Sequence, residues 1–207
     1  MAVAPAAPAP PGTPAVVAGR RAGIEVGAGF AVDLPDEPRW ARVGASLRLG
    51  VVLGALPLAL QLDGAITSHT SSVQRVGAGN ATFDSRIEVW DVPIGLGLLY
   101  RLERGRFLLA VGPRVSLHVV HASADAGLNC PTGSPAADCS GSRTALSAGA
   151  GAVVEGRLEL ARRLWAALSI GAEALLPEQT FTTASVRAAD LGSAQVSFVL
   201  GLVWRAY

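Results

Sequence analysis

The segment WDVPIGLGLLYRL, residues Trp90 to Leu102, is the part of this sequence that decides the fold. Large apolar residues occupy every second position in it, and small, polar or charged residues occupy most positions between them. The apolar set is Trp90, Val92, Ile94, Leu96, Leu98 and Tyr100, and the other set is Asp91, Pro93, Gly95, Gly97 and Arg101. Because successive side chains of a strand point to opposite faces, the segment predicts a β-strand with one apolar face and one small and polar face.

Two features complicate the beginning of this strand. Ile87 and Val89 are apolar but fall out of phase with Trp90. Pro93 stands in mid-strand, where it cannot donate a hydrogen bond to a neighbouring strand. A β-bulge shifts the alternation by one residue and tolerates proline, so we predict a bulge near residues 89 to 93.

Similar alternation recurs along the chain and gives eight strands in all. Gaps of about four residues alternate with longer polar gaps, which is typical of tight turns on one side of a membrane and long loops on the other. We therefore predict an all-β fold, an eight-stranded antiparallel up-and-down transmembrane β-barrel. The other predicted strands cover residues 24–33, 43–53, 58–67, 107–120, 145–160, 164–176 and 194–205. The tight turns are predicted near residues 55, 104 and 162, and the long loops at 68–84, 122–143 and 177–192.

The region from Ala145 to Leu176 has the weakest strand pattern. It is rich in Ala, Leu, Glu and Arg, so a helix remains open by propensity. Four glycines count against that helix, and a break at residues 161–163 divides the region into two strands. These glycines are Gly149, Gly151, Gly156 and Gly171.

Composition favours a membrane protein without a spanning helix. The mean hydropathy is +0.40, yet the longest apolar run, Leu49 to Leu60, contains Gly50, Gly54 and Pro57. A spanning helix needs about 20 predominantly apolar residues, so strands are the remaining way to cross. The net charge of +1 comes without a basic cluster, which argues against a nucleic-acid partner.

The chain divides into two parts by composition. Residues 1–19 contain five prolines among Ala, Val, Gly and one Thr, which predicts a disordered leader. Residues 20–207 form the predicted barrel domain. The leader has neither a basic start nor the apolar core of a secretory signal, so no signal peptide is expected within this chain and its export is left unexplained.

Charged residues gather on the predicted inner faces of the strands. An eight-stranded barrel is only wide enough to be filled by side chains, and buried charges must pair or hold water. We predict that Arg48, Arg114 and Arg157 form a network with carboxylates that closes the lumen to ions; the alternative is that these charges solvate the two mouths. The expected lumenal charge network is Glu25, Arg48, Asp63, Asp91, Arg114, Glu155, Arg157 and Glu173.

Aromatic residues lie near the predicted strand ends, as two interfacial girdles require. Ordinary core packing is the alternative interpretation. The expected girdle residues are Trp90, Tyr100, Trp165, Trp204 and Tyr207.

Cys130 and Cys139 are the only cysteines and lie in the longest predicted loop. In a loop outside the cell they favour a disulfide. His118 and His121 lie upstream and raise the alternative of zinc. Residues three apart on a strand face opposite sides, which is poor geometry for chelation, so we expect no metal.

From residue 22 onward the chain resembles the eight-stranded outer-membrane barrels of Gram-negative bacteria, the OmpA and OmpX-like group. The resemblance rests on the strand count, on Trp90 to Leu102, on LLAVGPRVSL (Leu108 to Leu117) and on the terminal Tyr207. It implies a location in the bacterial outer membrane, contact with its lipid, and recognition of the last strand by the barrel-assembly machinery. Trp204 and Tyr207 are three apart, a departure from the usual every-second-residue spacing of that signal.

Two other function classes stay open. His121-Ala122-Ser123 has the His-x-Ser spacing of outer-membrane lipid A deacylases, another eight-stranded family, but Ala124 stands where that family has asparagine. A soluble lipocalin-like barrel would bind a ligand inside an apolar interior. We expect a structural, adhesive or loop-mediated role with a non-conducting lumen, a possible extracellular ligand at the long loops, no cofactor and no enzymatic activity.

Overall fold

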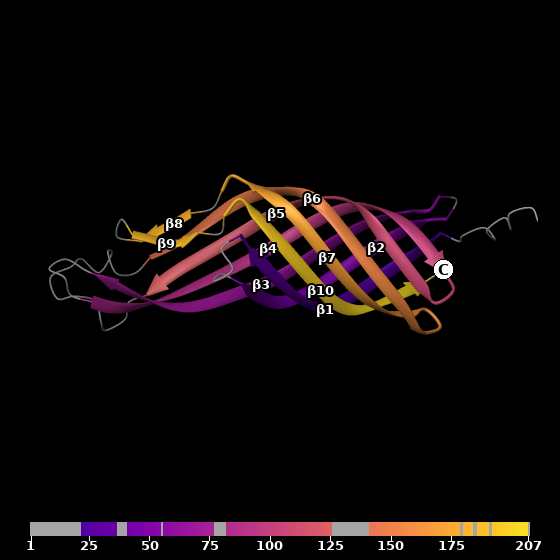
Figure 1. Ribbon diagram of the computed structural model, residues 1–207, viewed down its shortest axis with the longest axis horizontal. Helices are drawn as coiled ribbons and strands as arrows, with labels where there is room; N and C mark the ends of the chain where they lie inside the picture. Colours follow the sequence, from indigo (N-terminus) through magenta and orange to yellow (C-terminus); the bar gives the residue numbers. More distant parts are fainter. Residues whose placement is uncertain are drawn as a thin grey trace, which may run out of the picture.

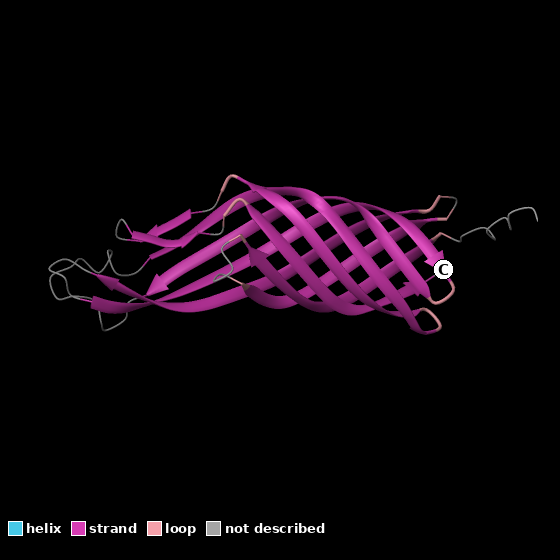
Figure 2. Ribbon diagram, in the orientation of Figure 1, coloured by secondary structure: helices cyan, strands magenta, loops and turns pink. Residues whose placement is uncertain are grey.

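Strands dominate the computed structural model, which describes residues 22–36, 41–54, 56–76, 82–125, 141–178, 180–183, 186–190 and 192–206 (Figure 2). Eight of them close into a barrel in the order β1-β10-β7-β6-β5-β4-β3-β2, and β8 pairs with β9 separately (Figure 1). The predicted all-β, eight-stranded antiparallel barrel is confirmed. The strands are β1 (Gly23–Pro35), β2 (Arg42–Leu53), β3 (Leu58–Val76), β4 (Thr82–Arg104), β5 (Phe107–Asp125), β6 (Gly141–Ala161), β7 (Leu164–Leu176), β8 (Thr180–Thr183), β9 (Val186–Asp190) and β10 (Ala194–Ala206).

Across these ranges, no helix is long and apolar enough to cross a membrane.

The first and last strands close the barrel. β1 pairs antiparallel with β10 from Ile24 opposite Ala206 to Pro35 opposite Gln195. The region from Ala145 to Leu176, where a helix stayed open, forms β6 and β7 instead. Each barrel strand has a hydrogen-bonded neighbour on both sides, but β3 beyond Ser68 and β6 before Ala148 pair on one side only.

The three tight turns lie at one end of the barrel, together with the end of β10 (Figure 1). Their predicted positions are confirmed. Leu56 N donates to Leu53 O at 2.8 Å in the first turn. Gly105 and Arg163 occupy the left-handed region in the other two, with φ of 60° and 74°. Glycine adopts this conformation without steric cost, which explains Gly105 in a two-residue connection.

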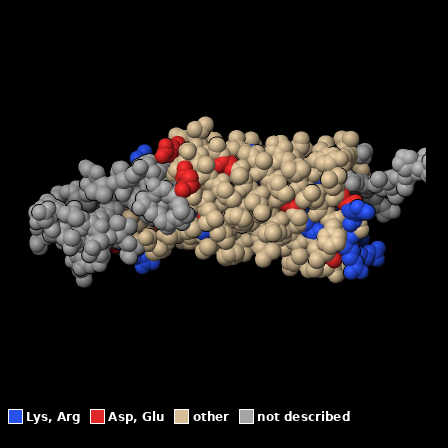
Figure 3. Space-filling model, viewed as in Figure 1, with Lys and Arg blue, Asp and Glu red and all other residues tan. Residues whose placement is uncertain are grey.

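The barrel wall is apolar outside and polar inside. Large apolar side chains such as Leu47, Phe107 and Leu200 are more than 60% exposed, whereas Glu25, Glu155 and Arg157 are at most 4% exposed. Much of the visible wall therefore carries no charge (Figure 3). A soluble ligand-binding barrel has the opposite arrangement, with apolar side chains inside and polar ones outside.

Four strands are longer than the sequence pattern indicated. β3 to β6 have 19, 23, 19 and 21 residues, against 12 or 13 for β1, β2, β7 and β10. The predicted loops at 68–84 and 122–143 were therefore too long, since β3 to β6 extend into them. The predicted loop at 177–192 lies between β7 and β10 as expected but contains the separate pair of strands β8 and β9. Apolar alternation fades there, but backbone pairing needs no apolar side chains.

The bulge predicted near residues 89 to 93 is wrong. β4 and β5 keep one register from Arg86 opposite Asp125 to Arg104 opposite Phe107. The register of β3 with β4 is likewise the same on both sides of Pro93. Ile87 and Val89 lie inside the barrel, in phase with Asp91.

The polarity of the two faces reverses at Trp90, and this reversal explains the apparent change of phase. Beyond it, Ile87, Val89, Val120, Ala122 and Ala124 form a buried apolar cluster on the inner face. Among the residues whose side chains the structure describes, the outer face there is mostly polar and includes Arg86, Glu88, His121, Ser123 and Asp125. We call this part the extension (residues 68–76, 82–90, 120–125 and 141–145), and the apolar-walled remainder of the barrel the belt.

Candidate functional site: the charged lumen

A lower charge cluster fills the lumen toward the tight turns. It consists of two glutamates and four arginines: Glu25, Glu155, Arg48, Arg101, Arg157 and Arg205. Glu25 accepts hydrogen bonds from Arg157 Nη1 at 2.7 Å and from Arg205 Nε at 2.8 Å. Arg101 Nη1 lies 2.9 Å from Glu25 Oε1. Glu155, fully buried, pairs with Arg48 and Arg157. Each buried carboxylate thus has at least two cationic partners, which offsets the cost of removing it from water.

An upper charge cluster lies toward the extension. It consists of Asp33, Arg42, Asp63, Asp91, Arg114, His118 and Glu173. Arg114 joins two of its carboxylates, because Nη2 lies 2.7 Å from Asp63 Oδ2 and Nη1 lies 2.8 Å from Glu173 Oε2. Arg42 Nη2 lies 3.2 Å from Asp91 Oδ2 and donates to Gln195 Oε1 at 2.8 Å. Carboxylates outnumber arginines here, whereas arginines outnumber carboxylates in the lower cluster.

His118 bridges two acids at the centre of the upper cluster. Its Nδ1 lies 3.0 Å from Asp91 Oδ2 and its Nε2 lies 3.1 Å from Glu173 Oε1, and the ring is fully buried. Only the imidazolium donates from both ring nitrogens, so the geometry suits the charged form. A histidine held between two carboxylates in this way pins β4, β5 and β7 together.

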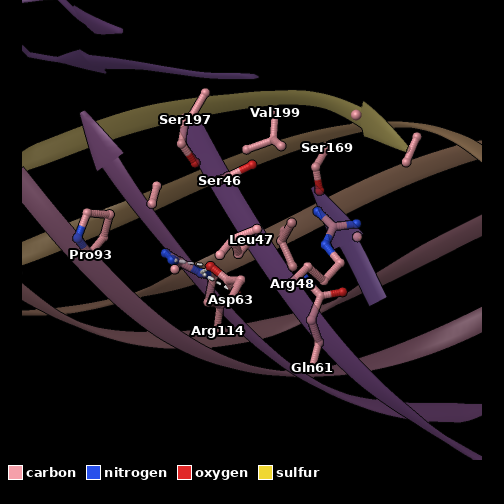
Figure 4. Close-up of a pocket in the computed structure, with 18 of the residues that line it drawn as sticks. Ser46, Leu47, Arg48, Gln61, Asp63, Pro93, Arg114, Ser169, Ser197 and Val199 are labelled. Carbon is pink, nitrogen blue, oxygen red and sulfur yellow. Dashed lines mark hydrogen bonds and ion pairs between the residues drawn. The ribbon is translucent and has the colours of Figure 1, made fainter. Parts of the chain in front are cut away.

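Glycines make room for the large charged side chains. A Cβ built on Gly95 would fall 2.6 Å from the Arg114 guanidinium carbon, so Arg114 can cross β4 only because residue 95 has no side chain. A cavity of about 60 Å³ remains between the clusters, lined in part by Arg48, Gln61 and Asp63 (Figure 4). This volume holds a few water molecules. Figure 4 also shows Asp63 facing Arg114 beside the cavity, while Arg48 lies near Ser169.

All eight residues expected in the lumenal network lie on strands of the belt with inward-facing side chains. The structure divides them into two groups. Four belong to the lower cluster (Glu25, Arg48, Glu155 and Arg157) and four to the upper cluster (Asp63, Asp91, Arg114 and Glu173). Arg48 and Asp63 are opposite each other in the register of β2 and β3, yet each binds a different partner.

Sequence reasoning missed several members of the clusters. Arg101, His118 and Arg205 share the inward phase of their strands, and that phase was the signal that could have included them. Arg42 precedes the predicted start of its strand at residue 43, so its phase was not considered. Asp33 has the same phase as Glu25 on β1 but was not included in the expected network.

The expected aromatic girdle needs one correction. Trp90, Tyr100 and Trp204 are 42 to 48% exposed on the outer face. Trp165 is instead 3% exposed and points inward, with the Arg205 guanidinium carbon 5.2 Å from the centre of its ring. In the alternation of β7, residue 165 is an inward position. The Trp165 ring therefore lies in the lumen and makes a cation–π contact with Arg205. Tyr207 lies outside the described residues.

The candidate catalytic pair lies on the outer face of the extension. His121 and Ser123 share that face, whereas His118 points inward, as predicted. His121 Nδ1 lies 2.9 Å from Thr144 Oγ1. The chemistry expected of a hydrolase needs this ring against Ser123 instead. Cys130, Cys139 and the leader 1–19 lie outside the described residues. Among the residues that are described, no group of three or more His, Cys, Asp or Glu is placed to hold a metal ion.

Comparisons with known proteins give structural matches only. No family model matches the chain, and no curated protein does. A major outer membrane protein of Thermus thermophilus matches with 16% identity and a TM-score of 0.60, over 89% of this chain and 99% of that one. Neisserial surface protein A matches with 12% identity and a TM-score of 0.50, over 89% and 96%. The chain therefore has the fold of the eight-stranded outer-membrane barrels, as the resemblance in its sequence predicted.

Proposed function

We propose that this chain is a small bacterial outer-membrane barrel with a closed lumen and a structural, adhesive or loop-mediated role. The proposal rests on the polarity of the belt, which is apolar outside and charged inside, the reverse of a water-soluble barrel. Leucine, valine and isoleucine side chains cover the outer face, and ion pairs fill the interior. Lipid is the surrounding that stabilises such an outer face, because in water the same face would favour aggregation.

The height of the apolar wall suits a membrane. From Trp90 to Leu102 there are twelve residue steps, which at about 3.4 Å each and a tilt of about 40° span about 30 Å. The hydrocarbon region of a bilayer is about 30 Å thick, which is of similar size. On this basis the extension stands in water beyond one leaflet, and the tight turns face the periplasm.

The two clusters support a lumen that does not conduct. The cavity of about 60 Å³ between the clusters has room for a few water molecules only. Single-channel recording in planar bilayers tests this, and we expect no steady conductance. A stable open level of several hundred picosiemens, absent in protein-free bilayers, would exclude a closed lumen.

The extension supports an interaction role. Its outer face carries Arg86, Glu88 and Asp125 beside serine and threonine hydroxyls, so it offers hydrogen bonds and charges to a ligand outside the cell. Removing the upper part of the β3–β4 or β5–β6 hairpin should leave the belt folded. Binding of the deleted protein to host-cell or bacterial surfaces, compared with the full chain, tests whether the extension is the interaction surface.

One experiment separates the membrane barrel from the soluble alternative. The protein is expressed with an export signal, the membranes are fractionated, and the extracted protein is run on a gel with and without boiling. We expect it in the outer-membrane fraction, with a shift in migration on boiling because a folded barrel resists detergent. Soluble protein without detergent would instead favour the lipocalin-like interpretation. Recognition of β10 by the barrel-assembly machinery belongs to the same proposal.

A further inference from the structure

The outer wall of the belt has a hollow at Gly156, close to the tight-turn end. Gly156 faces outward on β6, and a Cβ built on it would have no atom within 4 Å. Its neighbours across the strands are Leu109 on β5 and Leu168 on β7. These leucines are 47% and 49% exposed. A single missing side chain among large apolar ones therefore leaves an open apolar groove in the wall.

A cationic side chain lies at the rim of this groove. Arg104 lines it together with Leu102 and Phe107, and it pairs with Phe107 in the β4–β5 register. Phe107 is 65% exposed, as expected for a ring at a membrane interface.

Three more exposed arginines lie at the same end of the barrel. Arg106 is in the turn after Arg104, and its carbonyl oxygen accepts a hydrogen bond of 2.8 Å from Glu159 N. That bond brings the β4–β5 turn beside the end of β6, which continues into Arg162 and Arg163. Figure 3 shows basic side chains gathered at this end of the visible face.

Among the described residues, two further carboxylates, Glu103 and Glu159, lie near these arginines, and both have the inward phase of their strands. Glu103 lies 3.3 Å from Arg205 Nη1 and is engaged with the lower cluster. Glu159 shares the inward phase of Glu155 and Arg157 on β6 and is half-buried. The outward side of this rim is therefore positively charged.

We infer that the groove and the arginine rim form a binding site for an anionic phospholipid of the adjacent leaflet. One acyl chain lies in the groove over Gly156, and the phosphate lies against Arg104 with the neighbouring arginines around it. An apolar groove that opens toward the surroundings of the belt, with a cation where the groove ends, matches a molecule with a long apolar chain and an anionic head. This inference rests on the proposed membrane location.

Native mass spectrometry of the detergent-solubilised barrel, titrated with dipalmitoyl phosphatidylglycerol or dipalmitoyl phosphatidylcholine, tests the site. We expect tighter binding of phosphatidylglycerol to the wild type. Arg104→Gln should weaken that binding about fivefold, since an arginine near a membrane surface contributes about 1 kcal/mol to anionic lipid binding. The matched control is Arg86→Gln, which removes an exposed arginine at the other end and should change nothing.

The groove is tested separately. Gly156→Leu fills it and should weaken binding of both lipids at least fivefold, whereas Gly156→Ala should leave binding near wild type. Equal affinity of the wild type for the two lipids, equal effects of Arg104→Gln and Arg86→Gln, or no effect of Gly156→Leu would each overturn the site.

Failure of the site and failure of the membrane location give different results. Every variant is first checked for the boiling-dependent gel shift, and the wild type for flotation with vesicles of phosphatidylcholine alone. A barrel that floats and shifts but shows no lipid preference contradicts only the lipid site. A protein that does not float contradicts the membrane location itself.

Discussion

The belt and the extension share four strands but place opposite chemistry on their two faces. In the belt, β4 presents Ile94, Leu96 and Leu98 outward and Asp91 and Arg101 inward. In the extension, the same strand presents Arg86 and Glu88 outward, with Ile87 and Val89 buried. The register with β5 does not change between the two.

The strand pairing is the same in both regions, so it does not determine which side chains face outward. The medium outside the barrel does. Backbone hydrogen bonds continue through both regions, because they are made between strands whatever lies outside. The outer face of the belt suits lipid, and that of the extension suits water. The belt buries charged side chains, which lipid does not solvate, and the extension buries apolar side chains, which water does not solvate. The following substitutions test this contrast, from the largest expected effect to the smallest.

The largest effect is expected inside the belt. Arg157→Leu leaves Glu25 and Glu155 with one cationic partner fewer each, and loss of one member of a buried ion network costs about 3–5 kcal/mol. Denaturant unfolding in detergent micelles, followed by tryptophan fluorescence, measures the change. Arg86→Leu, on the exposed face of the extension, is the control and should stay within about 0.5 kcal/mol. Similar losses of stability in Arg157→Leu and Arg86→Leu would contradict the difference between the belt interior and the outer face of the extension.

Substitutions on the outer faces of the belt and the extension should differ nearly as much in their effect on the free energy of unfolding. Leu96→Arg places a charge against lipid near the middle of the belt and should cost about 2–4 kcal/mol, whereas Ser123→Arg in the extension should cost less than about 0.5 kcal/mol. Reversible unfolding from lipid vesicles measures both. If Ser123→Arg is the more destabilising variant, the boundary at Trp90 is misplaced.

The inner face of the extension should respond like a soluble core. Val89→Asn buries an amide among Ile87, Val120 and Ala122 and should cost about 1–3 kcal/mol. Hydrogen exchange should locate that loss in the amides of the extension, with the belt amides unaffected. Glu88→Asn, one residue away on the outer face, is the matched control, and equal exchange in the two variants would contradict a buried cluster.

The smallest effect is expected at the candidate catalytic serine. Ser123→Ala on the outer face of the extension should change stability by less than about 0.5 kcal/mol. Mass spectra of lipid A should be identical from cells expressing either protein. Loss of an acyl chain that depends on Ser123 would instead revive the deacylase interpretation.

Much of the belt was predictable from the alternation of residues. Trp90 to Leu102 indicated a strand and its two faces, and the eight charged residues expected in the lumen all point inward. Trp165 was assigned to the girdle because its nearness to a turn was weighed above its phase within β7. Its inward position follows the period of two.

The extension was not predictable in the same way. A rule that expects apolar residues outside interprets Ile87 and Val89 as a change of phase, and therefore as a bulge. The rule fails because the surroundings change along the strand while the geometry does not. The ends of β3 and β5 were likewise placed too early and the starts of β4 and β6 too late, since serine and threonine pair in a sheet without producing an apolar stripe.

By itself the sequence determined the number of barrel strands, the tight turns and the face on which most side chains lie, because a period of two is a local property of extended backbone. Only the tertiary structure decided which charges meet. Arg157 reaches Glu25 across 132 positions of the chain, and Arg48 and Asp63 are opposite one another yet bind different partners. Such choices depend on how the closed barrel staggers its strands and on where glycines leave room, which no single strand encodes.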